Sequence, residues 1–220
     1  MKERAIIFDM DGVIVDSEAL WDDIMVEVMQ SLGVPFHKGD AEKTRGLRID
    51  EGMAEWYEKY PWEGETIADV ANRITDRVTE AMLKNSKAMP GALDAIRAAK
   101  ETGYKLAIAS SAAQRVIEAV VERFEIEGMD FLYSAEHEKK GKPAPDVYLT
   151  TAKKLGVDPT ECLAVEDSPN GMKAAKAAGM RSLGVIDSRY VSIDEVAHIA
   201  DTVETSLVGF TKEKFESLFS

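Results

Sequence analysis

Residues 5–18 read AIIFDMDGVIVDSE and carry an apolar run straight into two acids, Asp9 and Asp11. A short apolar run of this kind is typical of a strand that is buried on both faces of a parallel sheet. In open α/β sheets, ligands bind at the carboxyl ends of the strands. The stretch therefore predicts a buried strand whose end presents paired carboxylates to a ligand.

Similar apolar runs recur along the chain, with helical segments between them. The runs are RAIIF at 4–8, YKLAIAS at 104–110, FLYS at 131–134, CLAVE at 162–166 and RSLGV at 181–185. The helical segments are ALDAIRAAKET, QRVIEAVVERF, PDVYLTTAKKL and NGMKAAKAA, and TKEKFESLF at 211–219 is expected to form a closing helix. Alternation of strands and helices implies right-handed crossovers. The sequence therefore predicts an α/β protein with a Rossmann-like, doubly wound parallel sheet.

Residues 17–88 break this alternation, because they show helical periodicity and no convincing strand. We call this segment the helical insertion. The turn AMPGA at 88–92 marks the return to the α/β pattern. The sequence thus predicts an α/β core formed by residues 1–16 and 89–220, with an all-helical domain at 17–88.

Charge and cysteine content narrow the expected partners and location. The formal net charge is −13, whereas nucleic acids and anionic membranes are bound by clustered Lys and Arg, so we expect neither as a partner. The first apolar run is too short for a signal peptide, and no segment approaches the length of a membrane span.

The single cysteine, Cys162, allows no internal disulfide and favours the cytoplasm. It opens an apolar run, which indicates a buried hydrophobe rather than a catalytic thiol.

Residue types that carry chemistry gather just after the predicted strands. They are Asp9 and Asp11, Ser110 and Ser111, Glu166 and Asp167, and Lys142 in the loop KKGKPAPD. Carboxylates that converge at one sheet edge raise one another's pKa values unless a cation compensates for their charge. Because these acids offer only oxygen ligands, and no His or Cys cluster lies near them in the sequence, Mg²⁺ is the expected cation.

A metal, a lysine and two serines together provide what a phosphoryl group requires. One carboxylate could attack phosphorus while a second, held protonated, gives its proton to the departing alcohol. Each motif also has an ordinary structural interpretation: solvated loop acids for DMD, a helix N-cap for ASS, a surface position for Lys142 and a turn for EDSPNG. Their shared placement after successive apolar runs favours the chemical interpretation.

At these residues the chain resembles the haloacid dehalogenase superfamily of phosphohydrolases. FDMDGVIVDSE is similar to the family's first motif, IASS to its second, Lys142 within KPAPDVY to its third and VEDSPNG to its fourth. The helical insertion resembles the family's small cap domain, which closes over the substrate. The resemblance covers nearly the whole chain, and it implies a phosphoric monoester hydrolase that depends on Mg²⁺.

The resemblance also implies a role for each site residue. Asp9 would be the nucleophile that becomes an aspartyl-phosphate, and Asp11 would be the general acid and base. The metal would be held by the Asp9 carboxylate, the Asp11 backbone carbonyl and Asp167, with Glu166 acting through water or as a weaker ligand. Ser110, the Ser111 backbone amide and Lys142 would bind the phosphoryl oxygens.

Two positions favour phosphate hydrolysis over other reactions of the superfamily. Its dehalogenases resemble this chain but lack an acid at the position of Asp11. Its β-phosphoglucomutases carry a histidine in the first cap helix. The corresponding segment of this chain, ALWDDIM, contains no histidine, and Trp21 lies near that place. We therefore expect a phosphatase, with mutase-like phosphoryl transfer and a non-catalytic protein that binds a phosphometabolite as the alternatives.

The helical insertion is expected to select the substrate. TRGLRIDEG at 44–52 resembles the family's specificity loop, in which Arg48 would reach a substrate hydroxyl or a second anion; a helix entry with solvated charges is the alternative. Trp21, Trp56 and Trp62 would form an apolar wall for a sugar or the core of the insertion. The chain is most similar to bacterial phosphatases of 2-deoxyglucose 6-phosphate and hexitol phosphates. The predicted substrate is a hexose, deoxyhexose or hexitol phosphate, and the predicted state is a monomer or weak oligomer.

Overall fold

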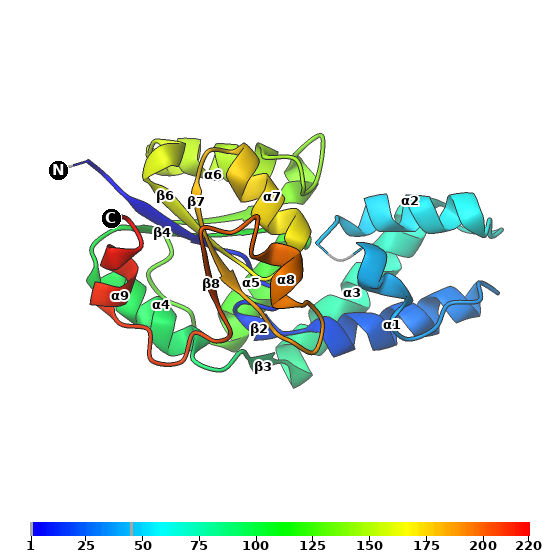
Figure 1. The fold of residues 1–220 in the computed structure, drawn as a ribbon. Coiled ribbons are helices and arrows are strands. Elements are labelled where there is room, and N and C mark those ends of the chain that lie inside the picture. The colour runs from blue at the N-terminus through cyan, green and yellow to red at the C-terminus, as the bar shows by residue number, and fades with distance from the viewer. Residues whose placement is uncertain (1, 45) are drawn as a thin grey trace.

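The structure, a computed structural model, describes residues 2–44 and 46–220. Six parallel strands form one sheet in the order β5-β4-β1-β6-β7-β8. Their bounds are β1 Ala5–Phe8, β4 Lys105–Ser110, β5 Phe131–Ser134, β6 Cys162–Glu166, β7 Arg181–Val185 and β8 Thr202–Glu204. Since β1 pairs with β4 on one side and β6 on the other, the acids that follow it lie in the middle of the sheet edge (Figure 1). The predicted parallel α/β fold is confirmed.

Helices cover both faces of this sheet. On the face formed by Ile6 and Phe8 lie α4 (Ala92–Glu101), α5 (Gln114–Arg123) and α9 (Lys212–Ser217). On the opposite face, formed by Ala5 and Ile7, lie α6 (Asp146–Leu155) and α7 (Pro169–Ala177). Successive strand residues point to opposite faces, and both faces of β1 are covered by helices. This explains why the run AIIF is apolar at every position.

Two short strand segments depart from the sequence-based expectation. The statement that residues 17–88 contain no strand is wrong at β3 (Lys87–Ala88), which pairs antiparallel with β2 (Val15–Asp16) where the chain leaves the core and returns to it. The edge strand β8 was not expected either, and it forms by pairing with β7. Strands of two or three residues carry no recognisable period, because their partners in space rather than their own sequence determine them.

The helical insertion is built from α1 (Glu18–Ser31), α2 (Ile49–Lys59) and α3 (Ile67–Asn85), which lie to one side of the sheet in Figure 1. A capping box starts α3: the Thr66 hydroxyl accepts a hydrogen bond from the Asp69 backbone, and the Asp69 carboxylate accepts one from the Thr66 backbone. Helix α3 packs against α1 and α2, and also against α5 of the core. One apolar cluster therefore runs from the insertion to the sheet.

The three tryptophans of the insertion divide between its core and the site. The Trp56 ring packs against Phe36 with centroids 4.6 Å apart, and also against Tyr60. Trp62 is buried and meets the edge of Tyr57. Trp56 and Trp62 thus hold the insertion together, while Trp21 lines the cavity described below.

The remaining short elements are α8 (Ile193–Val196) and 3₁₀ turns at Asp40–Thr44, Ala135–His137 and Pro159–Glu161. Within the described ranges, no helix combines the length and the apolar character that crossing a membrane would need. Cys162 is fully buried, and burial, with the charges of Asp158 and Glu161, raises the pKa of its thiol to about 12. The thiol is therefore protonated at neutral pH, as expected for a buried hydrophobe.

Candidate active site

Strand β1 and the turn that follows it fix the positions of Asp9 and Asp11. The Asp9 backbone N–H donates to the Val165 carbonyl at 2.8 Å, so strand pairing with β6 fixes the first acid. Gly12 then adopts a φ of +72°, and a Cβ atom there would lie 2.1 Å from Asp167 Oδ2. Only glycine combines this backbone conformation with so close an approach. The turn thereby brings the carboxyl ends of β1 and β6 into contact.

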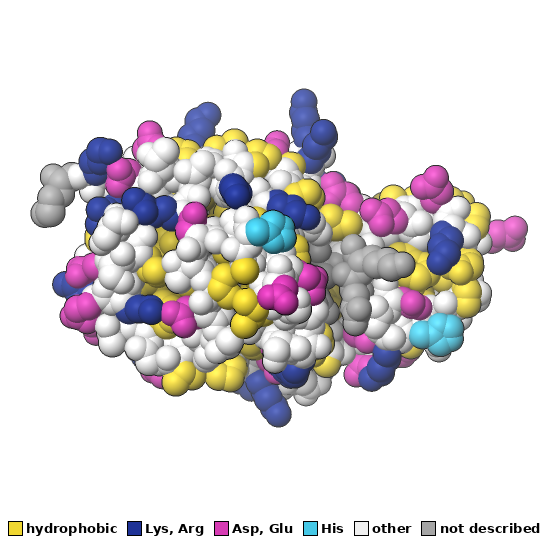
Figure 2. Space-filling model, in the orientation of Figure 1, with side chains coloured by type: hydrophobic (Ala, Val, Ile, Leu, Met, Phe, Trp, Pro, Cys, Tyr) yellow, Lys and Arg dark blue, Asp and Glu magenta, His cyan; other side chains and the backbone are white. Residues whose placement is uncertain are grey.

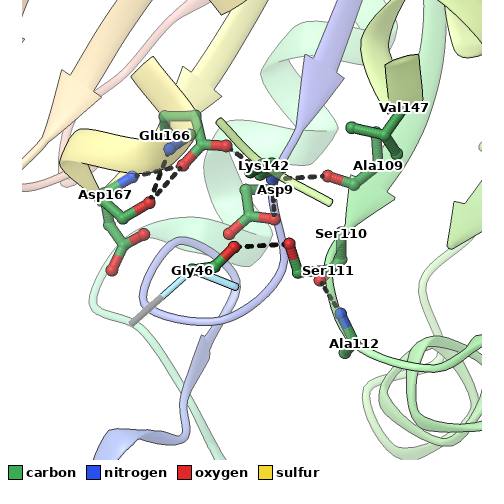
Figure 3. A network of polar contacts seen from close by, with 12 residues as sticks. Asp9, Gly46, Ala109, Ser110, Ser111, Ala112, Lys142, Val147, Glu166 and Asp167 are labelled. Carbon is green, nitrogen blue, oxygen red and sulfur yellow. Dashed lines mark hydrogen bonds and ion pairs between the residues drawn. The ribbon is translucent and has the colours of Figure 1, made fainter. Parts of the chain in front are cut away.

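Lys142 joins the acids of the two strands. Its ammonium donates to Asp9 Oδ1 at 2.7 Å, to Glu166 Oε1 at 2.6 Å and to the Ala109 carbonyl at 3.2 Å (Figure 3). An ammonium has three donors, so these contacts use all of them. The Lys142 side chain is 1% exposed. Although burial lowers its pKa, the carboxylates of Asp9 and Glu166 raise it above its usual value, so the residue stays charged.

Negative charge nevertheless exceeds positive charge at this sheet edge. Asp9, Glu166 and Asp167 are buried and offer ligand oxygens that all lie within 4.8 Å of one another. Burial raises the pKa of Asp9 to about 7, with Lys142 opposing the rise and Glu166 and Asp11 adding to it. Burial and the charges of Asp9 and Glu166 hold the pKa of Asp167 well above its usual value. One ammonium among these carboxylates leaves an environment that favours a further cation.

The Asp11 carboxylate has a different environment. Its Oδ1 accepts hydrogen bonds from the Ser17 hydroxyl at 2.6 Å and from the Trp21 indole N–H at 2.9 Å. Both donors belong to the start of the helical insertion. Burial raises the pKa of Asp11 more than these two hydrogen bonds lower it. Asp11 is therefore set up to hold a proton more readily than an exposed aspartate does.

The two serines after β4 point their hydroxyl groups differently. Ser110 Oγ accepts a hydrogen bond from the Ala112 backbone at 3.1 Å, and its own O–H stays available as a donor. The Ser111 hydroxyl donates to the Gly46 carbonyl at 2.7 Å, across to the helical insertion (Figure 3). Ser110 can thus donate toward the cavity through its side chain, whereas the Ser111 side chain connects the core with the insertion.

A cavity lies between the strand ends and the helical insertion. Its polar lining includes Asp9, Asp11, Ser110, Ser111, Lys142 and Asp167, and its apolar lining includes Trp21, Met25, Leu47, Ile49 and Met53. These predicted site residues therefore meet at one cavity, which Glu166 adjoins without lining it. A charged group can bind at the polar end while an uncharged part of the same molecule contacts the apolar wall.

The predicted motifs and this fold occur together in known proteins. A family model described as haloacid dehalogenase-like hydrolase matches residues 6–185. The chain belongs to the haloacid dehalogenase-like hydrolases. Hexitol phosphatase B of Escherichia coli (strain K12) is 40% identical to this hydrolase over 209 residues, and the match covers 94% of each chain. The predicted family and the predicted enzyme class, a phosphoric monoester hydrolase, are thereby confirmed.

Solved structures agree with this assignment. A crystal structure of a CbbY variant from Rhodobacter sphaeroides, in complex with xylulose-(1,5)bisphosphate, matches the hydrolase with a TM-score of 0.84 and 28% identity, over 94% of this chain and 96% of that one. A β-phosphoglucomutase from Clostridium difficile matches with a TM-score of 0.85 and 23% identity, over 99% and 97% of the two chains. The second likeness concerns the fold alone.

The position of Arg48 in this hydrolase differs from the expected contact with substrate. Its Nε and Nη2 atoms donate to the Asp50 carboxylate at 3.0 and 2.7 Å. Its Nη1 donates to the backbone carbonyls of Glu138 and Ala135 at 2.6 and 3.3 Å. Arg48 lines the cavity, but its guanidinium is bound by these groups rather than directed at a substrate. The alternative interpretation holds in part: Arg48 is the N-cap residue at the entry to α2, but its side chain is only 13% exposed and so is not a solvated charge.

A second contact lies beside Arg48. Glu51 Oε1 accepts a hydrogen bond from the backbone N–H of Gly141 at 3.0 Å. Gly141 directly precedes Lys142. The pairs Arg48–Glu138 and Glu51–Gly141, which we call the clasp, thus connect the start of α2 to the loop that carries Lys142.

Three hydrogen bonds of the site were not expected from the sequence. Ser17 and Trp21 contact Asp11, and Tyr148 donates a hydrogen bond to Glu166 from the face of α6. Tyr148 is part of the quoted run KPAPDVY, but as an aromatic residue in a helix it indicates core packing. A contact between a core hydroxyl and a carboxylate on another strand leaves no periodic signal in the sequence.

Proposed function

We propose that this hydrolase is a Mg²⁺-dependent phosphatase of small sugar phosphates, namely a hexose, deoxyhexose or hexitol phosphate. The observation that carries the proposal is the pair Asp9 and Asp11 at one cavity, with Lys142 bound to Asp9 and no cation bound to Asp11 within the described residues. The similarity to a hexitol phosphatase over 94% of both chains supports the choice of substrate class.

In the first step, Asp9 is the nucleophile. Lys142 holds Oδ1, so Oδ2 is the oxygen that attacks phosphorus and forms the aspartyl-phosphate. The bond between phosphorus and the sugar oxygen breaks, and Asp11 gives its proton to that oxygen. Because Asp11 Oδ1 already accepts two hydrogen bonds, the transferred proton resides on Oδ2. Protonation of the leaving alcohol typically contributes about 10²- to 10⁴-fold to the rate.

In the second step, the same residues act in reverse. Asp11, now ionised, takes a proton from a water molecule, and the resulting hydroxide attacks the phosphorus atom of the aspartyl-phosphate. The bond between phosphorus and Asp9 breaks, which releases inorganic phosphate and restores both side chains. The raised pKa of Asp11 suits a residue that must hold a proton in one step and collect one in the next.

The phosphoryl oxygens would be bound by the Ser110 hydroxyl and the Ser111 backbone amide, and by Lys142 through its positive charge, since its three N–H donors already contact protein oxygens. These groups come from the end of β4 and from the loop before α6, so the sheet fixes their positions before substrate arrives. Hydrogen-bond donors that are already oriented stabilise the charge on the phosphoryl group as it is transferred, because they do not have to rearrange during the reaction.

The donor set fits a magnesium ion. Asp9, Asp167 and the Asp11 backbone carbonyl would hold it, with Glu166 alongside, and all are oxygen donors, as a hard cation prefers. The excess of buried carboxylates over ammonium groups supports this assignment. When bound, the ion supplies positive charge for the phosphoryl oxygens and the Asp9 carboxylate. The single, buried cysteine supports a cytoplasmic location.

The substrate is expected to carry one phosphate. In the part of the chain that the structure describes, the cations that line the cavity are Lys142 and Arg48, and both are already paired with groups of the protein. Among these described residues, no unpaired cation lies beside the apolar wall around Met25 and Leu47 to bind a second phosphate. A hexitol or deoxyhexose chain can contact that wall through its carbon atoms.

Release of inorganic phosphate from a panel of hexose, deoxyhexose and hexitol 6-phosphates tests the proposal. With Mg²⁺, the wild type should release phosphate and free sugar, and a chelator should stop the reaction. Asp9→Asn should abolish turnover, while the surface substitution Asp94→Asn should not. An Asp9→Asn variant that keeps the wild-type rate would refute the proposal, and a sugar phosphate isomer as product would indicate a mutase.

A further inference from the structure

A buried tyrosine beside the proposed metal site takes no part in the mechanism above. Tyr148 lies on α6, is 0% exposed, and its hydroxyl donates a hydrogen bond to Glu166 Oε1. A phenol is neutral at pH 7 and a carboxylate oxygen can only accept, so the hydroxyl of Tyr148 is the donor in this contact. A polar group so deep in the core is retained only where its hydrogen bond offsets the cost of burial.

The hydrogen bond makes the two oxygens of Glu166 unequal. Oε1 accepts from both Tyr148 and the Lys142 ammonium, the latter at 2.6 Å. Among the described residues, the donors to Oε2 are the Asp167 backbone at 3.3 Å and the Ser168 hydroxyl at 3.4 Å, both long contacts (Figure 3). An oxygen with two strong donors has little capacity left for a cation, so Oε2 is the oxygen that Glu166 can offer.

Packing keeps the Glu166 carboxylate in this orientation. A Cβ atom at Gly171 would lie 2.1 Å from the carboxylate atoms of Glu166, so α7 confines the group from one side. Tyr148 confines it from α6, and the Lys142 ammonium lies 5.0 Å from the centre of the Tyr148 ring. The tyrosine therefore contacts both partners of the central ion pair, through its hydroxyl and through its ring.

We propose that Tyr148 is a positioning residue for the divalent cation: its hydroxyl keeps Glu166 Oε1 with Lys142 and thereby turns Oε2 toward the cation held by Asp9 and Asp167. This inference rests on the metal site of the proposed function. Without the hydroxyl, Lys142 is the sole strong donor to Glu166, and the carboxylate can rotate about its terminal bond. The cation and the Lys142 ammonium then compete for the same oxygen atoms of Glu166, which also weakens the contact of Lys142 with Asp9.

Tyr148→Phe tests the inference, because it removes the hydroxyl and keeps the ring. Isothermal titration of the intact, substrate-free protein with Mg²⁺ alone should show a dissociation constant about tenfold above that of the wild type, the usual effect of losing a partner of a metal ligand. The Mg²⁺ concentration for half-maximal activity should rise by the same factor, while kcat at saturating Mg²⁺ should change little.

Two comparisons separate positioning from a general effect on folding. Tyr104→Phe removes a hydrogen bond of 3.0 Å from Arg4 at the end of β4 opposite to the site, and should leave Mg²⁺ affinity unchanged. In a Glu166→Gln background, the loss of Mg²⁺ affinity caused by Tyr148→Phe should largely disappear, because the carboxylate that Tyr148 positions is absent.

Unchanged Mg²⁺ affinity in Tyr148→Phe would overturn the inference, whatever the melting temperature of the variant. Absence of Mg²⁺ binding by the wild type would overturn it as well. A wild type that binds Mg²⁺ but releases no phosphate would refute the proposed function alone.

Discussion

Single atoms decide the chemistry of this hydrolase. Lys142 occupies one oxygen of Asp9, and Ser17 with Trp21 occupies one oxygen of Asp11. Both acids line the cavity, where the other oxygen of each one can act. The motif DMD predicts that two acids are close together, but not which atom of each one is bound, since the donors come from residues distant in the sequence.

The proton held by Asp11 leads to a prediction about leaving groups. Asp11→Asn should slow the first turnover of a hexitol phosphate by about 10²- to 10⁴-fold, because the alkoxide needs a proton to depart. The first turnover of 4-nitrophenyl phosphate should be affected much less, because its phenolate departs without one. Rapid-quench measurement of the first equivalent of each product checks this. An equal loss for both substrates would contradict the role of Asp11 as the acid.

The buried thiol of Cys162 leads to a prediction about alkaline pH. Its pKa is raised from 9.0 to about 12 in the folded protein, so between these pH values the folded state binds more protons than the unfolded state. Stability contributed by this residue is therefore present below pH 9 and falls as the pH rises, by at most about 1.4 kcal/mol per pH unit. The difference in free energy of unfolding between wild type and Cys162→Ala should shrink from pH 8 to pH 10.5. A constant difference would contradict the burial argument.

At the scale of elements, strand ends and helix starts build the site. The central strand β1 places Asp9 beside the end of β6, and α2 begins where Arg48 and Glu51 contact the loop before α6. The strand ends could be predicted from sequence because each apolar run is local and its carboxyl end is evident. The clasp could not, because its partners in the lysine loop are backbone groups, the Glu138 carbonyl as acceptor and the Gly141 N–H as donor, which have no side-chain signature.

The clasp predicts a mobility effect of Arg48. Arg48→Ala removes the hydrogen bonds to the Glu138 and Ala135 carbonyls. Hydrogen–deuterium exchange of the substrate-free protein should then rise in residues 46–52 and 137–142, because α2 and the lysine loop lose a connection. The surface variant Arg97→Ala, whose pair with Asp94 is exposed, should leave exchange there unchanged. A raised KM without any change in exchange would instead indicate that Arg48 binds substrate directly, as the sequence first suggested.

At the scale of the whole molecule, the insertion and the core share one apolar cluster while the site lies between them. Helix α3, which contributes no described residue to the cavity lining, packs against α5 and anchors the insertion to the core. The sequence could predict the layers and the all-helical character of most of residues 17–88 from periodicity. It could not predict β3 or β8, because strands this short are determined by neighbours already in place.

The surface is consistent with a small-molecule substrate. Basic and acidic side chains are interspersed over the face shown in Figure 2, and the net charge is −13. A phosphate monoester must therefore be attracted by the cavity itself rather than by the outer field of the protein. The ammonium of Lys142 and the proposed cation supply that local attraction.

The central claim is that Asp9 carries the phosphoryl group during turnover. Acid quenching of the enzyme within its first turnover of a hexitol phosphate, followed by peptide mass spectrometry, tests this most directly. The phosphoryl group should be found on Asp9 at the earliest times and decline as inorganic phosphate accumulates. An enzyme that hydrolyses the substrate while Asp9 remains unmodified at every time would contradict the account.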